Sequence, residues 1–310
     1  MTHKAIPISS RAKGVDAAGI LVSRDLPYED FDALWDSIIL DKEVKDQLHA
    51  QAVLNFTLRP RVKRDRVPLH GVILLVGPPG TGKTSLGRGL ASVTARTFRK
   101  KDFLYLEVEP HALTSSSLGK SQRAVTELLG TTIAERASTG PVIVLLDEVE
   151  TLAAARSKMS MEANPVDVHR ATDAVLAQLD HLADSHPELL FIATSNFPGA
   201  IDEAFLSRAD LIVNVDMPGP EACRAILKST VEALSEAFPN VKKILSDPDF
   251  EKAAELCKGL DGRRIRKLVP AACALSKETA AEPGLLTAGA LVRAAKQAKK
   301  ELMAEKERSQ

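Results

Sequence analysis

Residues 72–84 of the sequence read V-I-L-L-V-G-P-P-G-T-G-K-T. Five consecutive apolar residues predict a strand that is buried on both faces. The glycines after it let the backbone fold around an anion with its N–H groups pointing inward. A strand that runs into G-x-x-x-x-G-K-T and then into a helix is typical of a phosphate-binding loop. We therefore predict such a loop, followed by a helix that begins at Thr84.

Each residue type in the loop has a chemical role. The N-terminus of the helix adds a partial positive charge that favours phosphate. Lys83 would reach the β- and γ-phosphates of ATP, and the Thr84 hydroxyl would bind Mg²⁺. ATP and Mg²⁺ are therefore the predicted cofactors. The predicted ATP contacts in the loop are Gly77, Pro78, Pro79, Gly80, Thr81, Gly82, Lys83, Thr84 and Ser85.

Two carboxylates follow a second apolar stretch at residues 142–146. Asp147 and Glu148 would then lie at the carboxyl edge of a parallel sheet, where the ligands of such sheets bind. Asp147 would hold Mg²⁺ together with Thr84. Glu148 would polarise the water that attacks the γ-phosphate. The pair predicts ATP hydrolysis rather than binding alone, and we expect the neighbouring Glu150 to be a surface residue.

A third apolar stretch ends in the amide of Asn196. This side chain would orient the attacking water beside Glu148. The alternative is an asparagine that only caps the end of a strand.

Two arginines extend the predicted site beyond one subunit. Arg208 comes just before the last predicted strand, where it would not reach its own phosphates. It would serve the γ-phosphate of a neighbouring subunit as a finger supplied in trans, which requires an oligomer. The alternative is an intrachain ion pair with Asp210 or Asp202. Within G-L-D-G-R-R-I-R-K-L at residues 259–268, Arg263 would fold back onto the nucleotide, and the other cations would be solvated or paired with carboxylates.

Strand and helix patterns alternate up to residue 215, which predicts an α/β fold with a five-stranded, parallel, doubly wound sheet. From residue 219 onward only helical patterns follow. We predict a flexible N-terminal tail at 1–25, a large α/β ATPase domain at 26–218 and a small helical lid domain at 219–310. The strands are expected at 72–76, 103–108, 142–146, 190–194 and 211–215.

Composition narrows the class of protein. The 41 basic residues equal the 41 acidic residues, whereas a protein that coats nucleic acid normally has a basic excess. We interpret the basic stretch at 59–66 as a solvated connection rather than a nucleic-acid patch. The three cysteines lack the spacing of a zinc site. No run of about 18 apolar residues occurs, so we expect a soluble, cytoplasmic protein without a membrane span.

Together these motifs resemble the pachytene-checkpoint class of AAA+ ATPases, which remodel HORMA-domain proteins. The resemblance covers roughly Leu26 to the C-terminus and rests on five pieces: G-P-P-G-T-G-K-T-S-L, L-L-D-E-V-E-T-L-A-A-A-R, A-T-S-N, D-E-A-F-L-S-R-A-D and G-L-D-G-R-R-I-R-K-L. It implies an AAA+ P-loop NTPase that forms a homohexameric ring. Such a ring hydrolyses ATP and opens or partly unfolds a HORMA domain, which releases the bound partner.

Compact members of this class look bacterial and are associated with antiphage operons. In these operons a HORMA protein activates a cyclic-oligonucleotide synthase, a nucleotidyltransferase, and the ATPase restrains that activation. By the same resemblance, Asn196 is the sensor on the adjacent strand, Arg208 the trans finger and Arg263 the lid sensor. Lys83 and Thr84 keep their phosphate and magnesium roles.

This sequence departs from the class in two places. Eukaryotic relatives carry an N-terminal adaptor-binding domain, whereas here about 25 residues precede the motor, so the ring or this tail would recruit the substrate. The loop that faces the central pore normally offers an aromatic residue. The matching stretch here is 113–120, with Ser117 and Leu118 where the aromatic would be, and we assign Ser117, Leu118 and Gly119 to the pore loop. A weaker grip favours limited opening over processive unfolding.

Two other functions fit parts of the sequence. A nucleic-acid loader or initiator of the AAA+ type would show a basic channel and salt-dependent binding to DNA. A nucleotide-gated binding module without turnover would not need the water-activating carboxylate of Glu148.

Overall fold

A computed structural model of the chain describes residues 11–12, 18–109, 120–151, 153 and 165–308. The chain divides into two compact units. Unit 1 consists of Met1–Trp35, Lys42–Val76 and Lys83–Asn214, and unit 2 consists of Asp36–Asp41, Gly77–Gly82 and Val215–Gln310. Most of the phosphate loop is therefore grouped with the C-terminal helices, which a linear division of the chain at residue 218 does not anticipate.

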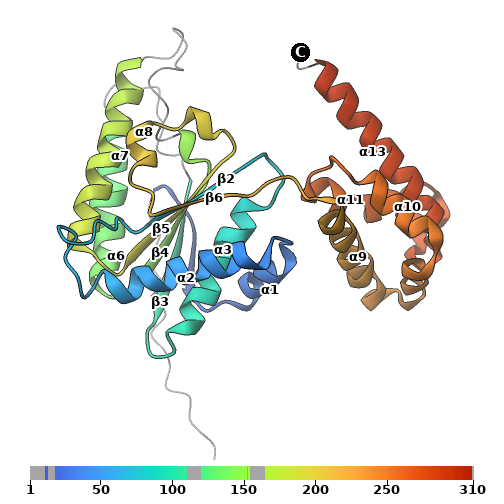
Figure 1. The fold of residues 1–310 in the computed structure, drawn as a ribbon, viewed down its shortest axis with the longest axis horizontal. Helices are drawn as coiled ribbons and strands as arrows, with labels where there is room; N and C mark the ends of the chain where they lie inside the picture. Colours follow the sequence, from blue (N-terminus) through green and yellow to red (C-terminus); the bar gives the residue numbers. More distant parts are fainter. Residues whose placement is uncertain (1–10, 13–17, 110–119, 152, 154–164, 309–310) are drawn as a thin grey trace, which may run out of the picture. The chain divides into compact units, whose positions relative to one another are not determined.

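Unit 1 is built on a six-stranded sheet with the order β1-β3-β4-β5-β2-β6 (Figure 1). Neighbouring strands from β3 to β6 run parallel, and β1 pairs antiparallel with β3. The predicted α/β class is confirmed, but the predicted count of five strands is wrong because β1 adds a sixth. The strands are β1 (Ile20–Leu26), β2 (Val72–Val76), β3 (Phe103–Val108), β4 (Val142–Leu146), β5 (Leu189–Ser195) and β6 (Leu211–Asn214).

Strand β1 lies inside the predicted flexible tail, so that prediction is wrong for residues 20–25. An edge strand obtains its stability largely from backbone hydrogen bonds to one neighbour, so its sequence need not be apolar. β1 has the sequence I-L-V-S-R-D-L, and most of its side chains are partly exposed. Just before it, Ala12 donates its N–H to Asp25 Oδ1 at 3.0 Å, and the Arg11 guanidinium donates to the carbonyl of Pro141 at 3.0 Å.

Helices cover both faces of the sheet. On one face, side chains of α5, the π-helix η1 and α7 join the core that alternate residues of the strands build, such as Val72, Leu74 and Val144. On the other face, a Cβ added at Gly87 of α3 would meet Leu145 at 2.8 Å. The helices of unit 1 are α1 (Glu29–Ser37), α2 (Lys42–Leu58), α3 (Lys83–Thr97), α5 (Lys120–Glu127), η1 (Leu128–Ile133), α6 (Ala134–Ser138), η2 (Val149–Thr151), α7 (Pro165–Ser185), η4 (Pro198–Ala200) and α8 (Glu203–Leu206). The last two residues of α1, Asp36 and Ser37, are grouped with unit 2.

Unit 2 carries helices and no strand among its described residues. Its core is separate from that of unit 1 and includes two of the three cysteines, Cys223 and Cys257, where burial raises the pKa of both thiols. Its helices are α9 (Pro220–Ala237), η5 (Pro239–Ser246), α10 (Pro248–Leu256), α11 (Gly262–Cys273), α12 (Lys277–Ala281), η6 (Pro283–Leu285) and α13 (Ala288–Arg308). Across the described part of the chain, no helix is both long enough and apolar enough to span a membrane.

A charged pair is built into the face of the sheet that α3 covers. The side chain of Glu107 on β3 is 3% exposed. Arg88 of α3 donates from Nε to Oε2 at 2.9 Å and from Nη2 to Oε1 at 2.7 Å. The Tyr105 hydroxyl donates to Oε2 at 2.8 Å. The bidentate geometry fixes how α3, which begins with Lys83, lies on the sheet.

We predict that Arg88→Ala lowers the free energy of unfolding by about 3 kcal/mol, because a buried carboxylate loses its counter-charge. The double variant Arg88→Met with Glu107→Leu should recover most of that loss, since it removes the charge together with its partner. Chemical denaturation measures both effects. Equal stability of Arg88→Ala and the double variant would contradict this interpretation.

Candidate functional site

Three predicted site residues form a hydrogen-bonded chain at the carboxyl edge of the sheet in unit 1. Lys83 Nζ donates to Asn196 Oδ1 at 2.8 Å, and Asn196 Nδ2 donates to Glu148 Oε1 at 3.1 Å. An ammonium group only donates and an ionised carboxylate only accepts, so the two neighbours fix the orientation of the amide. Asn196 therefore does more than cap a strand end: it connects the lysine of the phosphate loop to the glutamate after β4.

The second pair of predicted residues is Thr84 and Asp147. The Thr84 hydroxyl donates to Asp147 Oδ1 at 2.8 Å. Both groups offer the hard oxygen ligands that Mg²⁺ prefers. Adjacent ligands of an octahedron with metal–oxygen bonds of 2.0–2.1 Å lie about 2.9 Å apart, so the two oxygens have a spacing that fits Mg²⁺.

Thr194 belongs to this group although we assigned it no role from the sequence. Its hydroxyl donates to Asp147 Oδ1 at 2.5 Å and accepts the backbone N–H of Glu148 at 3.1 Å. The strand register contains the signal: Ala193 pairs with Leu146 across β5 and β4, so the next residues, Thr194 and Asp147, become neighbours. Thr194 is 1% exposed, and it holds both carboxylate residues in place.

The backbone at Glu148 is strained. Its φ is +52°, and among the described residues it is the one non-glycine with a positive φ. A side chain in this region costs on the order of 1–3 kcal/mol and persists where the surroundings enforce it. Here the Thr194 hydroxyl accepts the N–H of Glu148. The carbonyl of Glu148 accepts the N–H of Thr151 at 3.0 Å and the Thr151 hydroxyl at 2.9 Å. In this conformation the carboxylate of Glu148 lies within hydrogen-bonding distance of Asn196 Nδ2.

Glu150 is not the surface residue that we expected. Its Oε1 accepts the backbone N–H of Asn196 at 3.0 Å, and its Oε2 is buried. The expectation is wrong because the short 3₁₀ turn η2 directs the chain after Glu148 back toward the end of β5. Glu150 therefore fixes the backbone of the residue whose side chain joins Lys83 and Glu148.

The phosphate loop in unit 2 approaches the first turn of α11. Gly80 has a φ of +82°, and a Cβ at this position would lie 2.4 Å from Asp261 Oδ1, so glycine is required. Asp261 caps α11 by accepting the N–H of Arg264 at 2.9 Å. The N–H of Arg263 donates to the carbonyl of Gly80 at 3.1 Å. Loop and helix thus share one hydrogen-bonded junction within unit 2.

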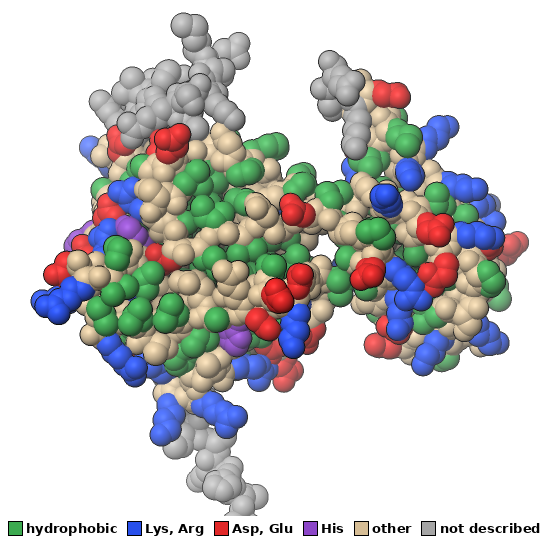
Figure 2. Space-filling model, in the orientation of Figure 1, with side chains coloured by type: hydrophobic (Ala, Val, Ile, Leu, Met, Phe, Trp, Pro, Cys, Tyr) green, Lys and Arg blue, Asp and Glu red, His purple; other side chains and the backbone are tan. Residues whose placement is uncertain are grey.

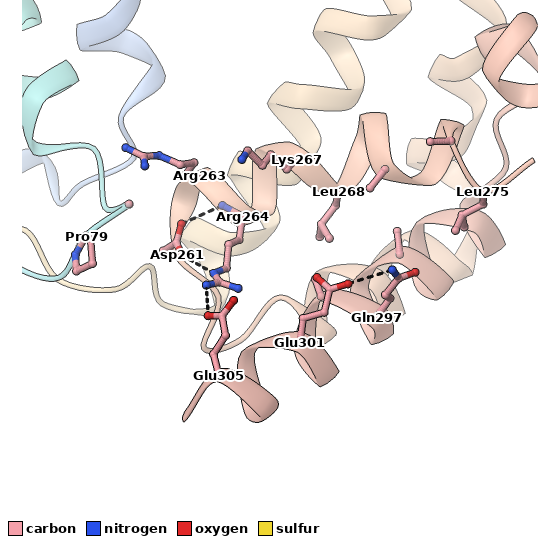
Figure 3. A pocket seen from close by; sticks show the side chains of 15 residues that line it. Pro79, Asp261, Arg263, Arg264, Lys267, Leu268, Leu275, Gln297, Glu301 and Glu305 are labelled. Carbon is pink, nitrogen blue, oxygen red and sulfur yellow. Dashed lines mark hydrogen bonds and ion pairs between the residues drawn. The ribbon is translucent and has the colours of Figure 1, made fainter. Parts of the chain in front are cut away.

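A cavity of about 700 Å³ lies beside this junction, between α11 and α13 (Figure 3). Arg263 is exposed and lines it, together with Pro79 and Gly80. Arg264 pairs with Asp261 at 3.0 Å and with Glu305 at 2.6 Å. That pairing agrees with the expectation for the neighbouring cations, whereas the role of Arg263 as lid sensor stays a prediction.

Arg266 makes a different contact from the one expected for the cations beside Arg263. Its Nη2 donates to the carbonyl of Ser37 at 2.6 Å, so its partner is a backbone group rather than a carboxylate or solvent.

Arg208 forms an ion pair with a residue that the sequence did not suggest. Its Nη2 lies 2.6 Å from Asp180 Oδ2, and its Nε lies 3.1 Å from Asp180 Oδ1. Asp210 instead accepts the backbone N–H groups of His70, Gly71 and Val72, and Asp202 caps α8 through the N–H of Ala204. Both partners proposed for the intrachain alternative are therefore wrong. The predicted pore-loop residues Ser117, Leu118 and Gly119 lie outside the described residues.

Known proteins resemble this chain in sequence and in fold. The model of the "ATPase family associated with various cellular activities (AAA)" matches residues 73–217. "CD-NTase-associated protein 6" of Pseudomonas aeruginosa is 57% identical over 91% of this chain and 92% of the relative. The "Pachytene checkpoint protein 2 homolog" of Arabidopsis thaliana is 34% identical over 78% of this chain and 59% of the relative, so the chain spans about three fifths of that protein.

A solved structure has the same fold. The chain in the "Structure of E. coli MS115-1 HORMA:CdnC:Trip13 complex" matches with a TM-score of 0.68 and 18% identity, over 90% of this chain and 95% of that chain. At this identity the likeness concerns the fold alone.

The strain at Glu148 generates a stability prediction. Glu148→Gly and Glu148→Ala both remove the carboxylate, but only glycine adopts a positive φ without cost. We expect the glycine variant to unfold with a free energy about 1 kcal/mol higher than that of the alanine variant, the reverse of the order in a helix. Chemical denaturation of the two variants measures the difference. An alanine variant as stable as the glycine variant would show that the turn is not strained.

Proposed function

Because the chain belongs to the AAA ATPase family, with CD-NTase-associated protein 6 and the pachytene checkpoint protein 2 homologues among its relatives, we propose that it hydrolyses ATP in order to remodel a HORMA-domain protein. One observation carries the catalytic part of the proposal: the hydrogen-bonded chain Lys83–Asn196–Glu148 beside the oxygen pair of Thr84 and Asp147. It contains a phosphate-binding cation, a water-polarising carboxylate and two oxygen ligands for Mg²⁺.

Each residue of the site has one task in hydrolysis. The loop N–H groups and Lys83 bind the phosphates and orient the γ-phosphate. Thr84 and Asp147 would hold Mg²⁺, and the bound ion would supply positive charge to neutralise the phosphates. Glu148 accepts a hydrogen bond from the attacking water and draws away its proton. Asn196 keeps the Glu148 carboxylate oriented, and its contact with Lys83 lets the bound γ-phosphate influence the position of Glu148.

The names of one relative and one matched structure support a class of substrate for this chain. The matched E. coli structure is a complex of a HORMA protein, CdnC and Trip13, and the Pseudomonas relative is named for its association with a CD-NTase. We propose that the substrate of this chain is a HORMA-domain protein bound to a nucleotidyltransferase. Opening the HORMA domain would disassemble that complex and restrain nucleotide synthesis in antiphage defence.

A substrate trap tests the remodelling proposal. Glu148→Gln keeps the contacts that bind ATP but weakens polarisation of the water, so kcat should fall by at least about 100-fold. With ATP and Mg²⁺, this variant should retain a HORMA-domain protein in a pull-down, whereas wild type should release it.

Lys83→Ala is the matched control for the trap, since it removes the phosphate contact and should retain nothing. Retention that is equal with and without ATP would contradict the proposed cycle.

We further propose that the subunits form a homohexamer in which Arg208 serves the γ-phosphate of the next subunit. Subunits of Arg208→Ala mixed with wild type should depress ATPase activity below the weighted average, because each inactive finger disables a neighbour's site. Arg224→Ala is a suitable control, since Arg224 pairs with Glu251 at 2.6 Å on unit 2 and should give additive mixtures. Additive behaviour of Arg208→Ala would refute the shared site.

A further inference from the structure

Two arginines bind the same carboxylate on unit 1. Asp180 of α7 receives Arg208 through two contacts, at 2.6 and 3.1 Å. Arg64, from the loop between α2 and β2, lies with Nη2 at 2.9 Å from Asp180 Oδ1. Figure 2 shows basic, acidic and histidine side chains close together on the part of unit 1 where α7 lies in Figure 1. The candidate trans arginine is therefore held inside a charge cluster.

Arg64 is the more firmly fixed of the two arginines. Its Nη1 lies 3.2 Å from Asp184 Oδ1, and its Nη2 lies 2.5 Å from His70 Nε2. Because a guanidinium only donates, this ring nitrogen accepts, and His70 is neutral. Burial, followed by the nearby Arg64 charge, lowers the pKa of His70, which agrees with a neutral ring. The 3.5 Å between His70 Nε2 and Asp180 is therefore not an ion pair.

Arg208 makes contacts with fewer residues than Arg64 does. Besides Asp180 it donates from Nη1 to the carbonyl of Ala204 at 2.6 Å, and its side chain is 20% exposed. If Arg208 left the cluster, its guanidinium would lose its contacts with the Asp180 carboxylate and the Ala204 carbonyl. Asp180 would lose its bidentate partner, and a partly buried carboxylate without a counter-charge is unfavourable. The presence of Arg64 decides how large that cost is.

We infer that Arg64 is a positioning residue for Arg208: it keeps Asp180 neutralised when Arg208 departs, so that Arg208 can exchange between Asp180 and the γ-phosphate of a neighbouring subunit. The docked position holds the finger near the subunit surface in one geometry. Arg64 lowers the free-energy cost of releasing Arg208 from Asp180. This inference rests on the proposed trans role of Arg208.

The test is a set of variants at Arg64 and Asp180. Arg64→Ala makes Arg208 the remaining arginine on Asp180, so kcat of ATP hydrolysis should fall roughly tenfold, while binding of a fluorescent ADP analogue stays unchanged. Adding Asp180→Asn to Arg64→Ala removes the carboxylate that holds Arg208, and kcat should return to within about twofold of wild type. A merely structural role of Arg64 would not produce this rescue.

Two further variants control for charge and folding. Asp184→Asn alters a contact of Arg64 that Arg208 does not share, so kcat should stay at the wild-type value. Arg64→Lys keeps the positive charge and should retain most of the activity, which it would do even if Arg64→Ala failed to fold. Thermal melting curves identify any variant that is unfolded.

The outcomes separate this inference from the proposal on which it rests. In the Arg208→Ala background, Arg64→Ala should have no further effect on kcat. If Arg208→Ala itself leaves kcat and the mixing curve unchanged, the trans role is wrong. If Arg208→Ala is inactive but Arg64→Ala equals wild type, or Asp180→Asn fails to restore it, the role of Arg64 is overturned.

Discussion

The parallel register of β4, β5 and β2 brings the residues of the site together. Parallel strands end at the same edge, so the residues that follow them are brought together however far apart they lie in the chain. Here the register places Asn196 between Lys83 and Glu148, and Thr194 beside Asp147. The position of each side chain in this group depends on a neighbouring element. Each is fixed by the strand or helix that carries it and by a hydrogen bond to a neighbouring element.

The sequence predicts most of this arrangement because the decisive patterns are local. Continuous apolar runs mark β2 and β4, and the polar residues directly after the strands mark the edge where they meet. What it misses depends on pairing between distant segments. β1 is too polar to stand out as a strand, Glu150 turns inward only because η2 forms, and Arg208 finds its partner 28 residues earlier on α7. Neither composition nor periodicity contains such long-range contacts.

Stability and function compete at two points of this site. Glu148 occupies a left-handed backbone conformation that disfavours any side chain, whereas the role in hydrolysis that we propose for it requires its carboxylate. Lys83 is buried with its ammonium beside an amide, which a folded protein tolerates when a phosphate is the intended partner. The surrounding sheet, whose strands β2, β4 and β5 are wholly buried, supplies the rigidity that holds both residues.

The two borders of the sheet have a consequence for how copies of this chain can meet. β1 covers the outer edge of β3, and the opposite border is β6, a strand of four residues. At the β6 border, a strand of four residues offers few unpaired backbone groups to another chain, so continuous strand pairing between two copies across that border is disfavoured. A contact between two copies across β6 would then rest on side chains. Contacts of that kind can be made and broken, whereas a shared β-sheet would join the two copies permanently.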